Sequence, residues 1–455
     1  MSFRRGSGVI WEKMNASRDL AEIYGAAIAA VDPYHAVLDA VKIAGDLLVV
    51  PGASCDLSKF DRILVVGAGK AAGRMAMAAE KLLAQRKVSG LVIVKEGHGS
   101  DLDVIGQVEA SHPVPDERGE EGARRILEMV RDADDRTLIL CLLSGGASAL
   151  LVLPDEGLTL GDKQRATSLL LKSGASIDEM NAVRKHLSKV KGGRLAQAAF
   201  PAKIVTLVIS DVIGDRLDVI ASGPTVADES TFADALAVIE KYGLREEMPE
   251  RVVDQLEKGA AGVLEETLKI SPGNCGIVVA NIGKALEAAG KKSRMLGYDT
   301  KLIGSILQGE ARDAARFLSG VARERLAGLM PGKRHCLLCG GETTVTVMGE
   351  GKGGRNQELA LAFAIAIEGM PGIAMLSAGT DGGDGPTDAA GAIVDGQTCI
   401  AARQFGLQPE SYLENNDSYR FFSSLDALSG STGHFKTGPT GTNVMDIQVM
   451  LLRKD

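Results

Sequence analysis

The clearest chemical content lies in a short apolar run that breaks into glycines around one lysine. It extends from Arg62 to Gly73 and has the sequence RILVVGAGKAAG. The pattern predicts a strand, a tight turn and the start of a helix. Gly67 and Gly69 let a ligand approach the backbone, and a helix N-terminus favours an anion. We therefore expect a phosphate group to bind at this turn, beside Lys70.

The turn alone leaves two classes of enzyme open. The stretch from Gly67 to Ala72 satisfies the looser dinucleotide-binding pattern, and Glu96 lies near the position of the acid that holds a ribose. The phosphate-binding pattern GxxxxGK[ST] is not met, because Leu64 and Ala71 stand at its first Gly and its Ser/Thr. A kinase and a nicotinamide-dependent reductase both remain possible at this point.

Glycine-rich loops follow four other apolar runs. They are Ser144–Leu150, Ser210–Arg216, Gly340–Thr344 and Gly379–Asp388. Each lies at the carboxyl end of an expected strand, where ligands bind in open α/β sheets. Their backbone and hydroxyl donors suit phosphate oxygens, and their carboxylates suit Mg²⁺. Phosphoryl transfer needs both kinds of group.

Basic residues occur in a helical pattern near the middle of the chain. The stretch Met180–Arg194 predicts a helix that ends at two glycines, with Arg184, Ser188 and Lys191 on one face. This face could bind an anion, or it could be a solvated basic surface near a helix C-terminus.

A second basic segment is the glycine loop Gly349–Glu358, which precedes the apolar helix expected over Leu359–Ile367. Arg355 could reach phosphate oxygens from a mobile loop of this kind. The same composition also fits a simple hairpin connection.

The elements that must position these loops alternate regularly. Continuous apolar runs at 63–66, 91–94, 138–143 and 205–210 are separated by helical patterns such as 71–85 and 120–131. Strands that are apolar on both faces, with helices between them, predict a parallel, doubly covered sheet. The region 228–271 predicts helices and a linker. A second alternation begins with the run at 277–280, and the β-branched run at 342–348 predicts an antiparallel strand, hence a mixed sheet.

Length and composition narrow the function further. A chain of 455 residues predicts two or three domains, and we place the boundary between 1–270 and 271–455. The net charge of −8 argues against nucleic acid and anionic membranes as partners. Six cysteines and the lack of a long apolar run favour a reduced, cytoplasmic protein. Cys336 and Cys339 are expected in a buried strand rather than in a redox or zinc site.

Nine motifs together resemble the glycerate 2-kinase family with a C-terminal MOFRL domain. They occur in the family's order along nearly the whole chain: GAGKAA from Gly67, HPVPD from His112, LSGGASAL from Leu143, NAVRKHLS from Asn181 together with KGGRLA from Lys191, SDVIGD from Ser210, GGET from Gly340, KGGRNQE from Lys352, GTDGGDG from Gly379 and TGPTGTN from Thr437. The resemblance implies a larger Rossmann-like doubly wound domain and a smaller α/β MOFRL domain (about 333–450), with the active site in the cleft between them. It also implies ATP-dependent phosphorylation of D-glycerate to 2-phosphoglycerate. Family members are often labelled hydroxypyruvate reductases, which keeps NAD(P)H-dependent reduction as the alternative.

The resemblance and the loops together suggest residue roles. The family's two catalytic cations correspond to Lys70 and Arg355. Mg²⁺ is expected on Asp211 and Asp215, with Asp381 or Asp384 next, and Asp211 is also the candidate base. The remaining candidates for binding ATP or substrate are Gly67, Gly69, Ser144, Gly145, Gly146, Ser148, Asn181, Arg184, Lys191, Glu342 and Asn356. His112 is expected to hold the backbone of its loop. We expect a monomer or a homodimer.

Overall fold

The computed structural model describes residues 6–270, 273–430 and 432–454, with side chains from Ala16 onward, and it divides into two compact units. We call Pro33–Ala280 the parallel-sheet unit. The mixed-sheet unit combines the chain up to Asp32 with Asn281–Asp455. Within the described residues, no helix has both the length and the apolar character needed to cross a membrane.

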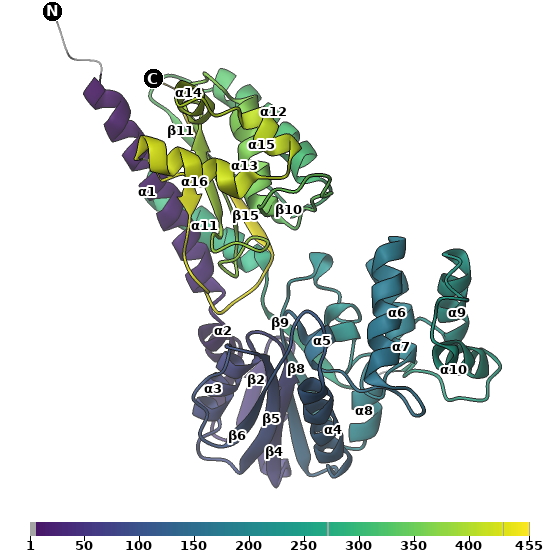
Figure 1. Cartoon of the computed structure of the whole chain (residues 1–455). Coiled ribbons are helices and arrows are strands. Elements are labelled where there is room, and N and C mark those ends of the chain that lie inside the picture. Colours follow the sequence, from purple (N-terminus) through teal and green to yellow (C-terminus); the bar gives the residue numbers. More distant parts are fainter. Residues whose placement is uncertain (1–5, 271–272, 431, 455) are drawn as a thin grey trace, which may run out of the picture. The chain divides into compact units, whose positions relative to one another are not determined.

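The structural division differs from the boundary expected at residue 270. Strand β9 (Cys275–Ala280) pairs with β8 (Lys203–Ile209) and so completes the parallel sheet, although the sequence predicts it as the start of the second alternation. Helix α1 (Gly6–Ala30) belongs to the mixed-sheet unit, where it packs along α11 (Ile282–Met295) (Figure 1). An apolar pattern identifies an element but not the neighbour against which it packs.

The parallel-sheet unit is a doubly wound α/β fold. Its six strands lie in the order β6-β5-β4-β7-β8-β9, and all neighbours are parallel. The bounds of the first five in chain order are β4 (Arg62–Ala68), β5 (Val88–Lys95), β6 (Ile105–Ala110), β7 (Thr137–Leu143) and β8 (Lys203–Ile209). The strand order reverses between β4 and β7, and the loops after these two strands therefore lie at the point where open α/β sheets bind ligands.

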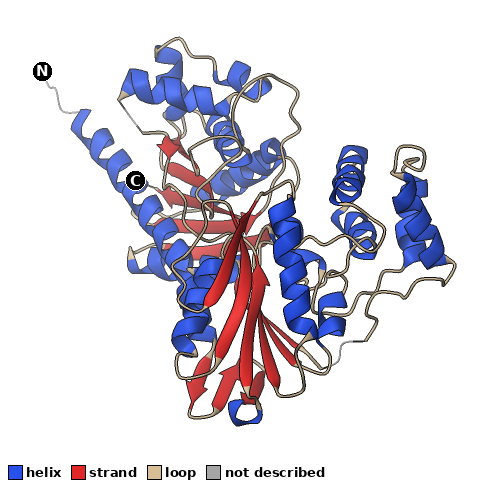
Figure 2. Cartoon of the chain, turned by 60° about the horizontal axis from the view of Figure 1, so that its bottom comes forward, coloured by secondary structure: helices blue, strands red, loops and turns tan. Residues whose placement is uncertain are grey.

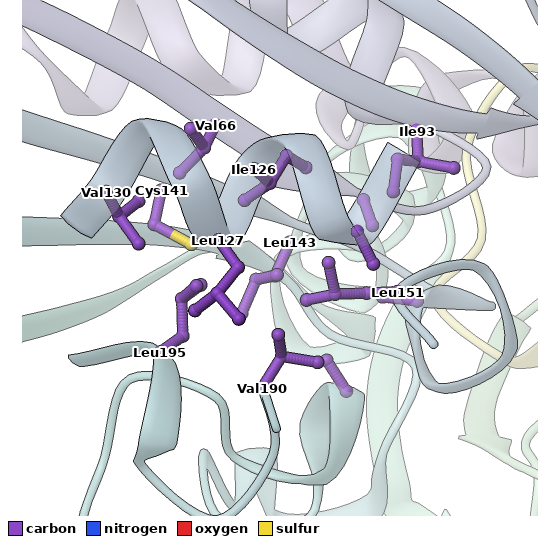
Figure 3. Close-up of a cluster of buried hydrophobic side chains, with 14 of the residues drawn as sticks. Val66, Ile93, Ile126, Leu127, Val130, Cys141, Leu143, Leu151, Val190 and Leu195 are labelled. Carbon is purple, nitrogen blue, oxygen red and sulfur yellow. The ribbon is translucent and has the colours of Figure 1, made fainter. Parts of the chain in front are cut away.

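Helices cover this sheet because side chains alternate along each strand. Leu64 and Val66 of β4 pack in one core with Ile126 and Leu127 of α4 (Glu117–Arg131). Figure 3 shows Val66, Ile126 and Leu127 in this core. Helices α2 (Pro33–Ala40) and α3 (Ala72–Leu82) pack against each other and also contact the sheet. The parallel, helix-covered sheet predicted from the sequence is confirmed.

Two smaller groups of elements complete the unit. An antiparallel sheet that the sequence analysis missed joins β1 (Lys42–Ala44), β2 (Leu47–Val50) and β3 (Ala53–Asp56), which precedes a 3₁₀ turn, Leu57–Lys59. A separate apolar core holds four helices: α6 (Leu160–Ser173), α7 (Ile177–His186), α9 (Phe232–Lys241) and α10 (Glu250–Ala260). The last two are the helices expected in 228–271. Short helices α5 (Ala147–Leu150) and α8 (Arg194–Ala199) contribute to the core on α4.

The mixed-sheet unit has the sheet type that was predicted. Its strand order is β10-β11-β15-β12-β13-β14, with β10 (Asp299–Leu307) and β11 (Arg334–Gly341) parallel and the other neighbours antiparallel. The remaining strands are β12 (Ile373–Gly379), β13 (Gly391–Asp395), β14 (His434–Phe435) and β15 (Asp446–Arg453). The helices after α11 are α12 (Ala311–Ala327), α13 (Arg355–Ala366), α14 (Thr398–Gln404), α15 (Pro409–Glu414) and α16 (Ser418–Ser429). Figure 2 shows the strands of each sheet side by side with helices around them.

The antiparallel strand expected at 342–348 is absent from the structure. In this segment only Thr344 forms a bridge, to Glu310, and Val347 and Met348 are exposed. No strand among the described residues pairs with this β-branched run, so its residue types alone do not make it a strand. The antiparallel pairing instead comes from β15, which lies between β11 and β12.

Candidate active site

The backbone of the turn after β4 is engaged within the protein. The N–H groups of Gly69, Lys70 and Ala71 donate to Ile93 O, Gly145 O and Ser144 Oγ at 3.0, 2.9 and 3.0 Å. A Cβ on Gly67 would lie 2.1 Å from Leu142 O, and one on Gly69 would lie 2.1 Å from Ser144 Oγ. These glycines let the turn pack against the neighbouring loop. The expected phosphate cradle of backbone N–H groups is therefore corrected, because the donors at 69, 70 and 71 are already used.

The loop after β7 offers the donors that the first turn lacks. No described residue accepts a hydrogen bond from the N–H groups of Gly145, Gly146 or Ser148. Gly146 has φ 86°, a left-handed conformation that favours glycine. The Ser144 hydroxyl accepts from Ala71 N and so links this loop to the turn after β4. This loop can therefore bind an anionic oxygen through its main chain.

Lys70 and His112 lie beside the same loop. A Cβ on Gly146 would be 3.0 Å from His112 Cδ2 and 3.5 Å from Lys70 Cγ. Burial, and then the positive charge of Lys70, lower the pKa of His112 to about 4. The imidazole is neutral near pH 7, so it fits a packing role, while the partly exposed Lys70 supplies the positive charge.

Asp211 and Asp215 follow β8, and Asp215 is in a left-handed conformation with φ 54° within the 3₁₀ turn Ile213–Asp215. Among the described residues there is no group of three or more His, Cys, Asp or Glu side chains placed to hold a metal ion. Mg²⁺ commonly keeps several waters and binds one or two carboxylates together with substrate phosphates. Asp211 and Asp215, which lie in the same loop, stay the candidate carboxylates for such a partial site.

Asp384 does not fit a metal site, which corrects that expectation. It is 3% exposed, and it accepts from the N–H groups of Asn356 and Gln357 at 3.0 and 2.9 Å, at the start of α13. Gln357 Nε2 donates to it as well, at 2.9 Å. Burial raises the pKa of Asp384 to about 6. Its oxygens satisfy the orphan N–H groups of a helix N-terminus, so the carboxylate is structural.

Asp381 lies shortly before Asp384, in the same glycine-rich loop. Its Oδ1 accepts from Gly383 N at 3.0 Å, which leaves it as the remaining metal candidate of the mixed-sheet unit. Tyr24 of α1 donates its hydroxyl to Gly379 O at 2.7 Å and so fixes the start of the same loop.

Arg355 is held between two carboxylates. Its Nε and Nη2 donate to Asp446 at 2.6 and 2.9 Å, and its Nη1 donates to Glu342 at 2.6 Å. Although burial opposes the charged form, Asp446 and Glu342 raise the pKa of Arg355. The sequence predicted a cation facing a ligand and a separate binding residue, whereas these two residues form an ion pair. Asp446 was missed, because it starts the strand that the apolar pattern did not identify.

The glycine loop before Arg355 is fixed by its neighbours rather than mobile. Asn416 Oδ1 accepts from the N–H groups of Met348 and Gly349 at 2.9 and 3.0 Å, and Asp417 Oδ1 accepts from Lys352 N at 2.8 Å. Asn356, expected to bind a ligand, is 1% exposed, and its Oδ1 accepts from Ser377 Oγ at 2.7 Å. Asn356 is therefore part of the buried hydrogen-bond network with Ser377 and Asp384 rather than a ligand-binding residue.

The basic face expected along 180–194 is not one helix face. Helix α7 ends at His186, and Ser188 instead forms a bridge with Pro154. Lys191 is 1% exposed, and its Nζ donates to Ser148 O at 2.8 Å. Lys191 therefore contacts the loop after β7, although it lies beyond the end of α7, the helix on which the sequence predicted it. Asn181 and Arg184 do lie on α7.

Comparisons with known proteins agree with this architecture. The family described as Domain of unknown function (DUF4147) matches residues 19–257, and the MOFRL family matches residues 335–446. The chain is 48% identical to the D-glycerate 2-kinase of Thermotoga maritima, over 86% of this chain and 91% of that protein. It is 42% identical to an Agrobacterium vitis protein described as a candidate hydroxypyruvate reductase, over 97% and 96%. A crystal structure of glycerate kinase from Thermotoga maritima superposes with a TM-score of 0.83 at 44% identity, covering 96% of this chain and 100% of that one.

Proposed function

Because the chain belongs to the glycerate 2-kinase family with a C-terminal MOFRL domain, we propose that it transfers a phosphoryl group from ATP to the C2 hydroxyl of D-glycerate. The products are 2-phosphoglycerate and ADP. The observation that carries the proposal is the loop Gly145–Ser148, whose N–H donors lie beside Lys70 where the strand order reverses. Such a combination binds anionic oxygens and neutralises charge on them.

In this proposal Lys70 compensates the negative charge that spreads over the transferring phosphoryl oxygens. The main chain of Lys70 is fixed by its bond to Gly145 O, so only the side chain has to move. The transition state of phosphoryl transfer needs positioning and charge stabilisation more than covalent help. The partly exposed side chain of Lys70 suits that task.

On the mixed-sheet unit, Arg355 offers Nη1 to a phosphate oxygen. Its partner Asp446 has a side chain only 1% exposed, whereas the Glu342 side chain is 44% exposed. A phosphate oxygen can replace an exposed carboxylate at small cost, because a surface ion pair contributes about 0–1 kcal/mol. Asp446 remains bound and orients the guanidinium.

Asp211 accepts the proton of the C2 hydroxyl as that oxygen attacks phosphorus. Asp211 and Asp215 would together hold Mg²⁺, which supplies charge neutralisation to ATP phosphates when bound. Asp381 is the second candidate ligand.

The alternative is NAD(P)H-dependent reduction of hydroxypyruvate, which the description of the Agrobacterium vitis relative suggests. One observation weakens it. The N–H groups that a dinucleotide fingerprint presents to pyrophosphate are bonded within the protein.

One pair of assays separates the two functions. The protein is supplied with ATP, Mg²⁺ and D-glycerate, and separately with NADH or NADPH and hydroxypyruvate. We expect ADP release that requires D-glycerate and stops on addition of EDTA. Turnover confined to the nicotinamide assay, or unaffected by EDTA, would refute the kinase proposal.

A further inference from the structure

Two side chains on α7 carry donors that no described residue satisfies. Asn181 is 2% exposed; its Oδ1 accepts from Ser222 Oγ at 3.0 Å, but its buried Nδ2 has no partner. Arg184 is partly buried, and no described side chain or carbonyl accepts from its guanidinium. Residues three apart on a helix lie on the same face. The two unsatisfied donors therefore occupy one side of α7.

The surroundings of these donors carry an excess of positive charge. Lys163 and Lys191 are 6% and 1% exposed, and the charge of Arg184 acts on both. Burial lowers the pKa of Lys163 to about 7, and it lowers the pKa of Lys191 and of Arg184 as well. The carboxylate that offsets Lys163 is Asp155, which Arg194 already binds at 2.6 Å. Burial therefore disfavours the charged forms of these groups, and an anionic ligand beside Arg184 would favour them.

The two lysines are not themselves available to that ligand. Lys163 Nζ donates to Leu187 O at 2.8 Å, and Lys191 Nζ donates to Ser148 O at 2.8 Å and to Ala221 O at 3.4 Å. Arg184 is therefore the cation with unused donors, and Lys191 is a positioning residue that joins the loop after β7 to the turn Ile220–Ser222. One guanidinium and one amide match a singly charged carboxylate better than a triphosphate.

Hydroxyl groups connect this pair to the loop after β7. Ser222 Oγ, the group that donates to Asn181, lies 3.3 Å from Ser148 Oγ. Ser222 and its neighbour Ala221 both have positive φ, 60° and 55°. Non-glycine residues in this conformation cost free energy and tend to occur where a site needs them. Ser222 thus lies between Asn181 and the loop after β7. In that loop the N–H groups of Gly145, Gly146 and Ser148 have no acceptor among the described residues.

We propose that Asn181 Nδ2 and Arg184 bind the carboxylate of the hydroxy-acid substrate, with Ser148 and Ser222 beside it. This inference rests on the proposed function and specifies its substrate subsite. It assigns to Arg184 the recognition of the acid, to Ser222 the orientation of Asn181, and to Lys70 the separate task of phosphoryl transfer.

The test uses the full-length protein and the variants Arg184→Met, Arg184→Lys and Asn181→Asp. Asn181→Asp keeps the oxygen that Ser222 binds and replaces only the donor. The matched control is Arg165→Met on α6, whose side chain is 52% exposed and 3.9 Å from Glu247. Steady-state kinetics give separate KM values for D-glycerate and ATP. Thermal unfolding without ATP, in the presence and absence of D-glycerate, reports binding independently of turnover.

We expect Arg184→Met and Asn181→Asp to raise the KM for D-glycerate by about 30-fold or more, with the KM for ATP within about twofold of wild type. Arg184→Lys should raise it by about tenfold, because the charge remains but the paired donors are lost. The increase in Tm caused by D-glycerate should disappear in Arg184→Met. The Tm of the free Arg184→Met protein should not fall, because the guanidinium that is removed is partly buried and no described residue accepts from it. Arg165→Met should behave as wild type.

Three results would overturn the subsite. One is an increase in the KM for ATP rather than for D-glycerate, which would assign the cluster to a phosphate. Another is an unchanged KM for D-glycerate in all three variants, or a lower Tm of free Arg184→Met, which indicates a structural role. The third is a wild-type protein whose Tm does not respond to D-glycerate. A wild-type protein that binds D-glycerate without phosphorylating it would refute the proposed function while supporting the subsite.

Discussion

Replacement of Lys70 by methionine is expected to remove most of the catalytic rate without disturbing the fold. Methionine keeps an aliphatic stem of similar length next to Gly146, and the Lys70 N–H bond to Gly145 O is unaffected because it belongs to the main chain. A unit charge about 4 Å from a phosphoryl oxygen contributes about 4 kcal/mol at an effective dielectric constant of about 20. Since each 1.36 kcal/mol corresponds to tenfold in rate, kcat should fall by roughly 10³-fold.

The assay is ADP release at saturating ATP and D-glycerate, with Lys81→Met as the matched control. Lys81 lies in the last turn of α3 and its ammonium stacks over the Tyr34 ring, so its loss should leave kcat unchanged. A second readout is independent of turnover. Because burial and then the charge of Lys70 lower the pKa of His112 to about 4, Lys70→Met should raise that pKa. An NMR titration of His112 in both proteins measures the difference. If kcat is retained and only KM rises, Lys70 contributes ground-state binding and the mechanism is wrong.

Three further predictions concern the other charged groups. Asp446→Asn should lower the free energy of unfolding by about 2 kcal/mol, because it weakens the two charged hydrogen bonds from Arg355, whose guanidinium keeps Glu342 and solvent; an unchanged urea midpoint would contradict the pairing. Asp384→Asn should lower the Tm yet leave the Mg²⁺ concentration needed for half-maximal activity unchanged, whereas Asp211→Asn should raise that concentration; a raised Mg²⁺ requirement in Asp384→Asn would restore Asp384 as a ligand. The pKa of His112 is lowered from 6.5 to about 4, so the unfolded chain binds more protons there and stability falls as pH drops through this range. His112→Gln should make the free energy of unfolding depend less steeply on pH over this range. An unchanged pH dependence would show that His112 does not contribute to it.

Four strands of the parallel sheet, β4, β5, β7 and β8, could be predicted from sequence because each contains a continuous apolar run between helical patterns. Val65 and Val66 face opposite sides of a sheet that helices cover on both faces, so no alternation is needed to recognise the strand. Strand β6 has the sequence IGQVEA, in which Gly, Gln and Glu interrupt the apolar pattern, so it could not be recognised in this way. The mixed-sheet unit was harder. Val345 and Val347 suit a strand by residue type, but no neighbouring strand lies beside them, and only tertiary structure decides that.

The candidate site shows the same limit at the level of single residues. Glycines marked the right loops, but the reason for Gly67 and Gly69 is close packing against Leu142 and Ser144 rather than contact with a ligand. Conversely, the partner of Arg355 could not be found from spacing, because Asp446 lies far along the chain and opens a strand. Local patterns place loops at the ends of strands, while the pairing of charges depends on which strands become neighbours.

The identity of the phosphorylated product tests the central claim most directly. If the carboxylate of D-glycerate is held by Asn181 and Arg184, the adjacent C2 hydroxyl is the one kept at a fixed position for attack. A misplacement of about 1 Å can reduce a rate on the order of 10²-fold, so a rigid carboxylate site should produce nearly one isomer. Phosphorus NMR of the product formed from ATP and D-glycerate distinguishes the two isomers. The account predicts 2-phosphoglycerate, and predominant 3-phosphoglycerate, or no phosphorylated product, would contradict it.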